Sequence, residues 1–190
     1  MKLLPLYCLA VPLFLAGCNL NSYSPQAERI MQDSPVTSPA GTVTLKTRIL
    51  EVEKKTDTRW QILLPNWEPK KVVTTVNTQT LKTSLSAAKH IDINAITLSA
   101  TSDGKPVPLA IRTESPGESG EYHFVFTPSV NKTDTSITLG VNMDIQDPKG
   151  SFNLHQKVSI PHGHSLLVAR ALSENKLQIV IVTPQAGTGV

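Results

Sequence analysis

Histidine side chains are the first to consider for chemistry, because imidazole serves both as a metal ligand and as a general base. The chain has five histidines, and His162 and His164 flank a single glycine, with His155 on the predicted strand before them. A metal site needs several His, Cys or carboxylate ligands that converge on one point. We interpret this pair as solvated turn residues, and the sequence predicts neither a metal site nor a cofactor.

A serine nucleophile is the next candidate, in the segment Gly117-Glu118-Ser119-Gly120. It is superficially similar to a G-x-S-x-G nucleophile elbow, but Glu121 stands where the final glycine belongs and no predicted strand runs directly into the serine. We interpret residues 116–120 as a flexible loop. Phosphate-loop, dinucleotide-binding and H-E-x-x-H motifs are absent from the sequence. We therefore predict no catalytic residues and no enzyme activity.

The charged residues do not by themselves indicate a binding partner. Acidic and basic residues alternate after the first predicted strand, a pattern typical of a solvated face: Glu51, Glu53, Lys54, Lys55, Asp57 and Arg59. The formal net charge of +3 is spread along the chain and forms no basic patch, so nucleic acid is not a predicted partner.

The N-terminal residues predict that the protein is exported. Lys2 is followed by an apolar stretch, residues 3–16, and small residues precede Cys18. This arrangement is typical of a secretory signal and is too short for a spanning helix. The residues Leu15-Ala16-Gly17-Cys18 resemble the lipobox of bacterial lipoproteins. The resemblance implies cleavage between Gly17 and Cys18 and acylation of the Cys18 thiol and its new amine. A plain secretory signal with an incidental cysteine is the alternative.

The resemblance also implies a location. In lipoprotein sorting, aspartate after the lipidated cysteine retains a protein in the inner membrane, and this chain has Asn19 there. We therefore expect an outer-membrane, lipid-anchored protein with its domain facing the periplasm. Several acyl chains hold a protein on a bilayer without a spanning element. Cys8 leaves with the signal, so no intramolecular disulfide is expected.

Composition shifts divide the chain into four parts. Residues 1–17 form the signal peptide, and residues 18–41 a flexible tether rich in Ser and Pro that permits a short helical stretch around Gln26 to Met31. Residues 42–185 form a single domain, and 186–190 a tail. Within the domain, Thr, Val and Ile are abundant, which favours strands.

The apolar pattern of the domain predicts a β-rich α+β fold, with about eight or nine strands in mostly antiparallel sheets. Predicted strands and apolar stretches lie at residues 43–52, 60–64, 72–76, 93–99, 107–111, 122–126, 136–145, 152–160, 165–169 and 177–182. Asp103-Gly104 predicts a tight hairpin before residue 107. Leu81, Leu85 and Ala88 recur at helical spacing, so we predict one helix over residues 78–89, capped by Asn77 or Thr78.

The clearest alternation runs from residue 136 to 145 and leads through a turn into residues 152–160. One face of the first strand is wholly apolar: Ile137, Leu139, Val141, Met143 and Ile145. These strands have about the 9–11 residues that a tilted strand needs to cross a bilayer, so the face is a candidate assembly or lipid-facing surface. The alternative, which we favour, is a half-buried hairpin covered by the predicted helix, since a lone hairpin leaves unpaired edges in lipid.

Taken in order, the elements from 42 to 184 resemble the C-terminal core of the bacterial secretins, ring channels of type II and III secretion and type IV pili. The similar segments are Thr44–Val52, Thr80–Leu98, Phe124–Val130 with its Thr-Pro, Thr135–Met143, Ile160–Val168 and Ile179–Pro184. The resemblance covers about three quarters of the chain. Secretin ring domains and a Gly-Gly-Leu after residue 168 are missing, and residues 62–76 leave little room for the hairpins of a gated inner barrel.

Two functions follow as expectations. The first is a structural component of a secretion or pilus assembly, which forms a homo-oligomer or joins other components. The second is a monomeric, pilotin-like lipoprotein that binds a partner. No small-molecule substrate is indicated, and strand edges are the expected contact surfaces of an assembly.

Overall fold

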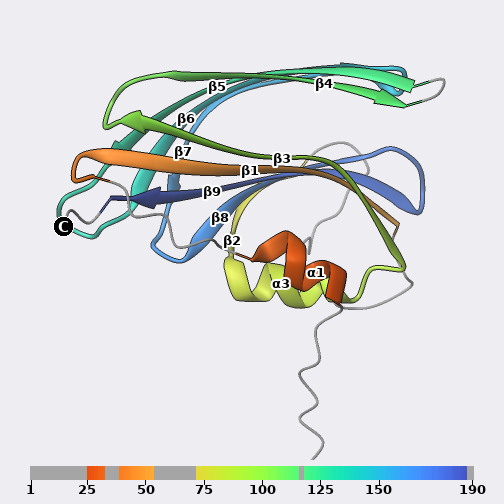
Figure 1. Cartoon of the computed structure of the whole chain (residues 1–190), viewed down its shortest axis with the longest axis horizontal. Helices are drawn as coiled ribbons and strands as arrows, with labels where there is room; N and C mark the ends of the chain where they lie inside the picture. Colours follow the sequence, from red (N-terminus) through yellow and green to blue (C-terminus); the bar gives the residue numbers. More distant parts are fainter. Residues whose placement is uncertain (1–24, 33–38, 54–71, 116–117, 188–190) are drawn as a thin grey trace, which may run out of the picture.

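The computed structural model describes residues 25–32, 39–53, 72–115 and 118–187 (Figure 1). In this part of the chain nine strands form a β-rich fold, as the sequence predicts, and there are two helices where one is predicted. The helices are α1 (Pro25–Met31) and α3 (Thr78–Ser86). The strands are β1 (Thr42–Glu53), β2 (Val72–Asn77), β3 (His90–Ser102), β4 (Val107–Ser115), β5 (Glu118–Val130), β6 (Ile137–Asp147), β7 (Gly150–Ile160), β8 (His164–Ala171) and β9 (Lys176–Ala186).

The strands form two antiparallel sheets. Sheet A has the order β2-β8-β9-β1-β3, and sheet B is the meander β4-β5-β6-β7. Figure 1 shows sheet B stacked on one face of sheet A, while α1 and α3 lie against the opposite face. The structure is therefore a three-layer arrangement of helices, sheet A and sheet B.

Alternation along the strands explains why sheet A has an apolar core on both of its faces. On β1, Val43, Leu45 and Ile49 belong to the core between the sheets, whereas Leu50 and Val52 belong to the core under the helices. A strand buried on both faces becomes an almost continuous apolar run, because successive side chains point to opposite sides. The final strand β9 follows the same rule from Leu177 to Val182.

The hairpin of β6 and β7 forms as the sequence predicts, with Ile137 opposite Ile160 and Asp147 opposite Gly150. Its apolar face is buried, but the covering element differs from the expected one. The helix α3 packs with its Leu81 and Leu85 in the other core, and the β6 side chains contact sheet A instead. A helix covers only a narrow stripe, whereas five strands match the full length of an extended hairpin.

The turn at Asp103-Gly104 does not form the predicted hairpin. Gly104 has the positive φ (73°) expected of a tight turn, but β3 and β4 do not pair with each other. β3 pairs with β1, and β4 pairs with β5. The turn carries the chain from sheet A to sheet B, and the residues 161–163 carry it back between β7 and β8. Both connections lie at the same end of the sandwich.

Residues 25–31, which the sequence assigns to the tether, pack against the domain. Helix α1 forms within the stretch that the sequence permits, and Ala27 and Ile30 are fully buried against sheet A. Arg48 of β1 is buried beneath it, where Nε donates to the Ile30 carbonyl at 2.8 Å and Nη1 donates to Thr183 Oγ1 at 2.7 Å. Residues 25–31 therefore belong to the domain.

Helix α3 begins as predicted, because the Asn77 side chain accepts from the backbone N–H groups of Gln79 and Thr80. It ends at Ser86, three residues before the predicted end at 89. Among the described residues, neither helix is long and apolar enough to cross a membrane.

Candidate functional site

The predicted lipid anchor lies outside the described residues. Gly17 and Cys18, the predicted cleavage site, and Asn19, the predicted sorting residue, all fall in the first 24 positions. The apolar stretch 60–64 is outside them as well. These predictions stay predictions.

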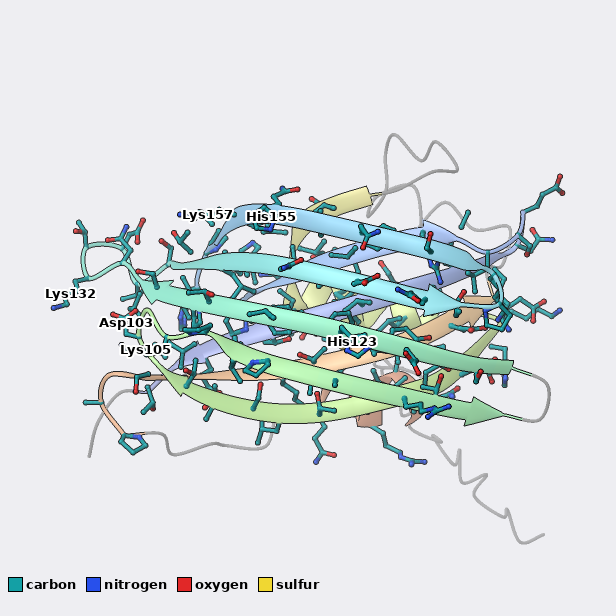
Figure 2. All side chains as sticks on the ribbon, turned by 90° about the horizontal axis from the view of Figure 1, so that it is seen from above. Asp103, Lys105, His123, Lys132, His155 and Lys157 are labelled. Carbon is teal, nitrogen blue, oxygen red and sulfur yellow. The ribbon has the colours of Figure 1, made fainter. Side chains whose placement is uncertain are left out.

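The candidate assembly or lipid-facing side chains on β6 are all buried in the described structure. Ile137, Leu139, Val141, Met143 and Ile145 are each at most 4% exposed and pack in the core between the sheets. In this arrangement the polar face of the hairpin is the outer one. Figure 2 looks onto the outer face of sheet B, where His123 of β5 and His155 and Lys157 of β7 extend outward.

The most elaborate polar feature is a cluster at the end of the sandwich opposite the two connections, which we call the polar end. It consists of Glu51, Tyr122, Asp147, Lys149, Arg170, Lys176 and Gln178. Sheet A contributes β1, β8 and β9 through four of these residues, and sheet B contributes β5 and the β6–β7 turn. The cluster therefore ties the free end of sheet B to sheet A.

Arg170 is the centre of the inner half of the polar end. Its Nη2 forms an ion pair with Asp147, Nε donates to Gln178 Oε1 at 2.8 Å, and Nη1 donates to the Gly150 carbonyl at 3.1 Å. Gln178 in turn donates to the Tyr122 hydroxyl at 3.0 Å. Burial raises the pKa of Tyr122, with the carboxylates of Asp147 and Glu51 adding to the rise, so the phenol stays neutral.

Glu51 is the centre of the outer half and corrects a sequence prediction. The alternating charges after β1 predict a solvated face, yet Glu51 is only 9% exposed. Its carboxylate bridges Lys149 Nζ at 3.0 Å and Lys176 Nζ at 2.7 Å. Burial raises the pKa of Glu51, but the hydrogen bonds and charges of the two lysines outweigh burial and hold it below its ordinary value. The hydrogen bond to Glu51 likewise raises the pKa of Lys176.

A cavity of about 560 Å³ opens at the polar end. Besides Glu51 and the two lysines, its lining includes Asp92, Asn94 and Arg112. The size is within the range of about 300–1,000 Å³ typical of ligand pockets, but those are mostly apolar, whereas this lining is dominated by polar groups engaged in ion pairs. The arrangement is suited to fastening two sheets together.

The histidines and the serine considered for chemistry are dispersed in the structure. His162 is exposed in the β7–β8 turn, and the His164 ring lies 3.0 Å from the His162 carbonyl. Ser119 and Gly120 belong to β5, not to the loop that the sequence predicts, and a Cβ on Gly120 would lie 3.1 Å from the Tyr122 ring. Within the described ranges, no three His, Cys, Asp or Glu side chains could hold a metal ion together.

The four outer strands of the sheets are the remaining candidate surfaces. Three of them carry features that discourage strand addition: β2 has six residues, β4 contains Pro108 and Arg112, and β7 carries the exposed Lys157. The fourth, β3, has 13 residues and the exposed side chains of Ile93, Ile96 and Leu98. Sequence reasoning anticipated edges as contact surfaces but had no signal for which strand is outermost.

Comparison with models of protein families, with curated proteins and with solved structures found no match to this chain.

Proposed function

We propose that this chain is a non-catalytic, lipid-anchored outer-membrane protein whose β-sandwich is a structural component of a secretion or pilus export assembly. The observation that carries the proposal is the combination, in one sequence, of a lipobox ending at Cys18 and secretin-like segments in the secretin order. The lipid fixes the protein to the bilayer, and the sandwich supplies the surfaces for assembly.

The positions of these segments in the fold support the proposal. Residues 44–52 lie in β1, residues 164–168 in β8 and residues 179–184 in β9, and these three strands are neighbours in the middle of sheet A. Residues 124–130 and 137–143 lie in β5 and β6, the two inner strands of sheet B. Five of the six similar segments thus lie mainly in inner strands of the two sheets, whereas Thr80–Leu98 spans α3 and the edge strand β3. A domain of this kind could serve as a repeated building block.

The polar end supports a structural role in preference to a catalytic one. Glu51 is held between Lys149 and Lys176, and Asp147 is held by Arg170. Carboxylates engaged in this way stabilise the contact between the sheets, and a general acid or base would need access to a substrate proton.

A monomeric, partner-binding lipoprotein is the second candidate. The observation that favours it is the polar cavity beside Arg112 and Asp92, which could receive a charged segment of another protein. In this case the sandwich would be a scaffold, since a fold does not determine a function.

Fractionation and crosslinking of cells that express the full chain test the proposal. We expect the wild-type protein to sediment with the outer membrane and to crosslink into species with further copies or export components. Cys18→Ser should leave the fold intact and release the protein from the membrane fraction, whereas the matched Asn19→Gln variant should stay bound. Continued sedimentation of Cys18→Ser would refute the lipid anchor, and the absence of every crosslinked species would refute the assembly role.

A further inference from the structure

Strand β3 is the outermost strand of sheet A and has only β1 as a partner in the described part of the chain. From Ile93 to Thr101 it carries no charged side chain and no proline. Natural sheets protect long edges with lysines, prolines, bulges or short strands, because unpaired N–H and C=O groups recruit further strands. The one bulge of β3, between the partners of Ile49 and Leu50, lies near its start and leaves residues 95–101 regular.

The exposed apolar side chains of β3 lie beside this open edge. Ile96 is 43% exposed and Leu98 is 56% exposed, and they are opposite Arg48 and Lys46 of β1 on the helix side of sheet A. Ile93, at 41%, adds to the same strand. Three of the four large hydrophobic side chains that the described structure leaves exposed are therefore on one edge strand.

On the opposite face of β3, two buried hydroxyls lack hydrogen-bond partners in the described structure. The hydroxyls of Thr97 and Ser99 are buried and have no hydrogen-bond partner in the described structure, and Thr47, opposite Thr97 on β1, is in the same state. Buried polar groups without partners are costly and uncommon in native proteins. A strand added at this edge would bring new groups next to Thr97 and Ser99.

We propose that β3 pairs antiparallel with β3 of a second copy of this chain, so that two A sheets join into one continuous sheet. This inference rests on the assembly role proposed above and names the surface and the partner. A two-fold axis beside Thr97 places Ile96 of each copy opposite Leu98 of the other, which joins the two apolar stripes. The same register places the two Thr97 side chains opposite each other, and Thr–Thr pairs across strands can hydrogen-bond.

Charge favours a second copy over a different partner. Because residues 93–101 are uncharged, the antiparallel register brings no like charges together in its centre. At each end, Asp92 of one copy lies near the turn 102–105 of the other, where Lys105 is exposed. Both carboxylates at this end already have partners in their own copy, Asp103 the backbone N–H of Val130 at 2.9 Å and Asp92 the His90 ring at 2.8 Å and Lys176 Nζ at 3.7 Å. Lys105 adds a cation beside them, so the ends of the paired strands carry compensated charges.

The test is the number of copies in the full lipidated chain, extracted in a mild non-ionic detergent and measured by analytical ultracentrifugation or native mass spectrometry. We expect an even number of copies for the wild type. Leu98→Lys should separate the pairs and raise their dissociation constant by about tenfold or more, since it adds a charge to the edge. Val125→Lys, on an inner strand of sheet B at 38% exposure, is the matched control and should change nothing.

A disulfide crosslink gives a second test, which does not depend on whether Leu98→Lys folds. Thr97→Cys should give a disulfide-linked pair on mild oxidation, while Ala110→Cys on the β4 edge should not. A wild type without pairs, or pairs that persist in Leu98→Lys, would overturn the inference. If such a wild type or variant still crosslinks to other copies or export components, the assembly role stands and only the β3 edge is wrong. If that protein crosslinks neither to other copies nor to export components, the assembly role and the β3 pairing are both wrong.

Discussion

The ion pair between Arg170 and Asp147 offers the sharpest test of how the two sheets are held together. Their side chains are 10% and 6% exposed. Arg170→Met removes the cation and its hydrogen bonds to Gln178 and Gly150, while the apolar stem is largely preserved. Asp147 is then left as a nearly buried carboxylate without its cation, and it keeps two hydrogen bonds, from the Lys149 backbone N–H at 2.9 Å and from Gln178 at 3.3 Å.

The expected loss is large because one charge of a buried pair stays behind. Removal of one partner of a buried ion pair costs about 3–5 kcal/mol, a large fraction of the roughly 5–15 kcal/mol by which domains are stable. The double variant Arg170→Met/Asp147→Asn should recover part of this loss, because neither charge of the pair then remains buried. Lys89→Met is the matched control: its pair with Glu53 has side chains 62% and 35% exposed, so at most about 1 kcal/mol is expected.

Urea unfolding, followed by far-ultraviolet circular dichroism, measures these free energies of unfolding. The slope against urea should be similar in all variants, since the same surface is exposed on unfolding. A loss below about 1 kcal/mol for Arg170→Met would show that the pair behaves like a surface pair. Equal losses for the single and double variants would show that the uncompensated charge is not the cause, and either result would refute the reasoning.

Three further predictions concern single side chains. The lowered pKa of Glu51 means that its ionised form stabilises the folded state above the ordinary carboxyl pKa, and that this contribution disappears as the pH falls through the lower folded-state pKa. Glu51→Gln should therefore reduce the loss of the free energy of unfolding between pH 7 and pH 3, measured by urea unfolding. An unchanged pH dependence would contradict the bridge to Lys149 and Lys176. Leu139→Ala should cost about 2–5 kcal/mol in the same assay, because the residue is fully buried between the sheets, and a negligible cost would argue against this core. Asn77→Ala should cost about 0.5–2 kcal/mol through the lost cap of α3, while a thermal melt identical to wild type would exclude the capping role.

Local patterns predicted most of the elements because they depend on neighbouring residues. The alternation of residues 136–145 predicted β6 and its hairpin, and the spacing of Leu81 and Leu85 predicted α3. The same patterns could not assign strands to sheets. A turn such as Asp103-Gly104 has the same local chemistry whether the chain returns to its own sheet or crosses to another.

The polar end could not be predicted because its contacts are distant in sequence. Glu51 and Lys149 are 98 positions apart, and Tyr122 and Gln178 are 56 apart. Next to Lys54 and Lys55, Glu51 has the sequence context of a solvated residue, and only the meeting of β1, β9 and the β6–β7 turn buries it. The edge position of β3 has the same origin, since it depends on the order of strands and not on the strand itself.

Electron microscopy of the full lipidated protein, extracted from the outer membrane in mild detergent, tests the central claim most directly. The assembly role predicts particles that contain several copies of the chain or the chain together with export components. Strictly monomeric particles, with no partner recovered after crosslinking in cells, would contradict it.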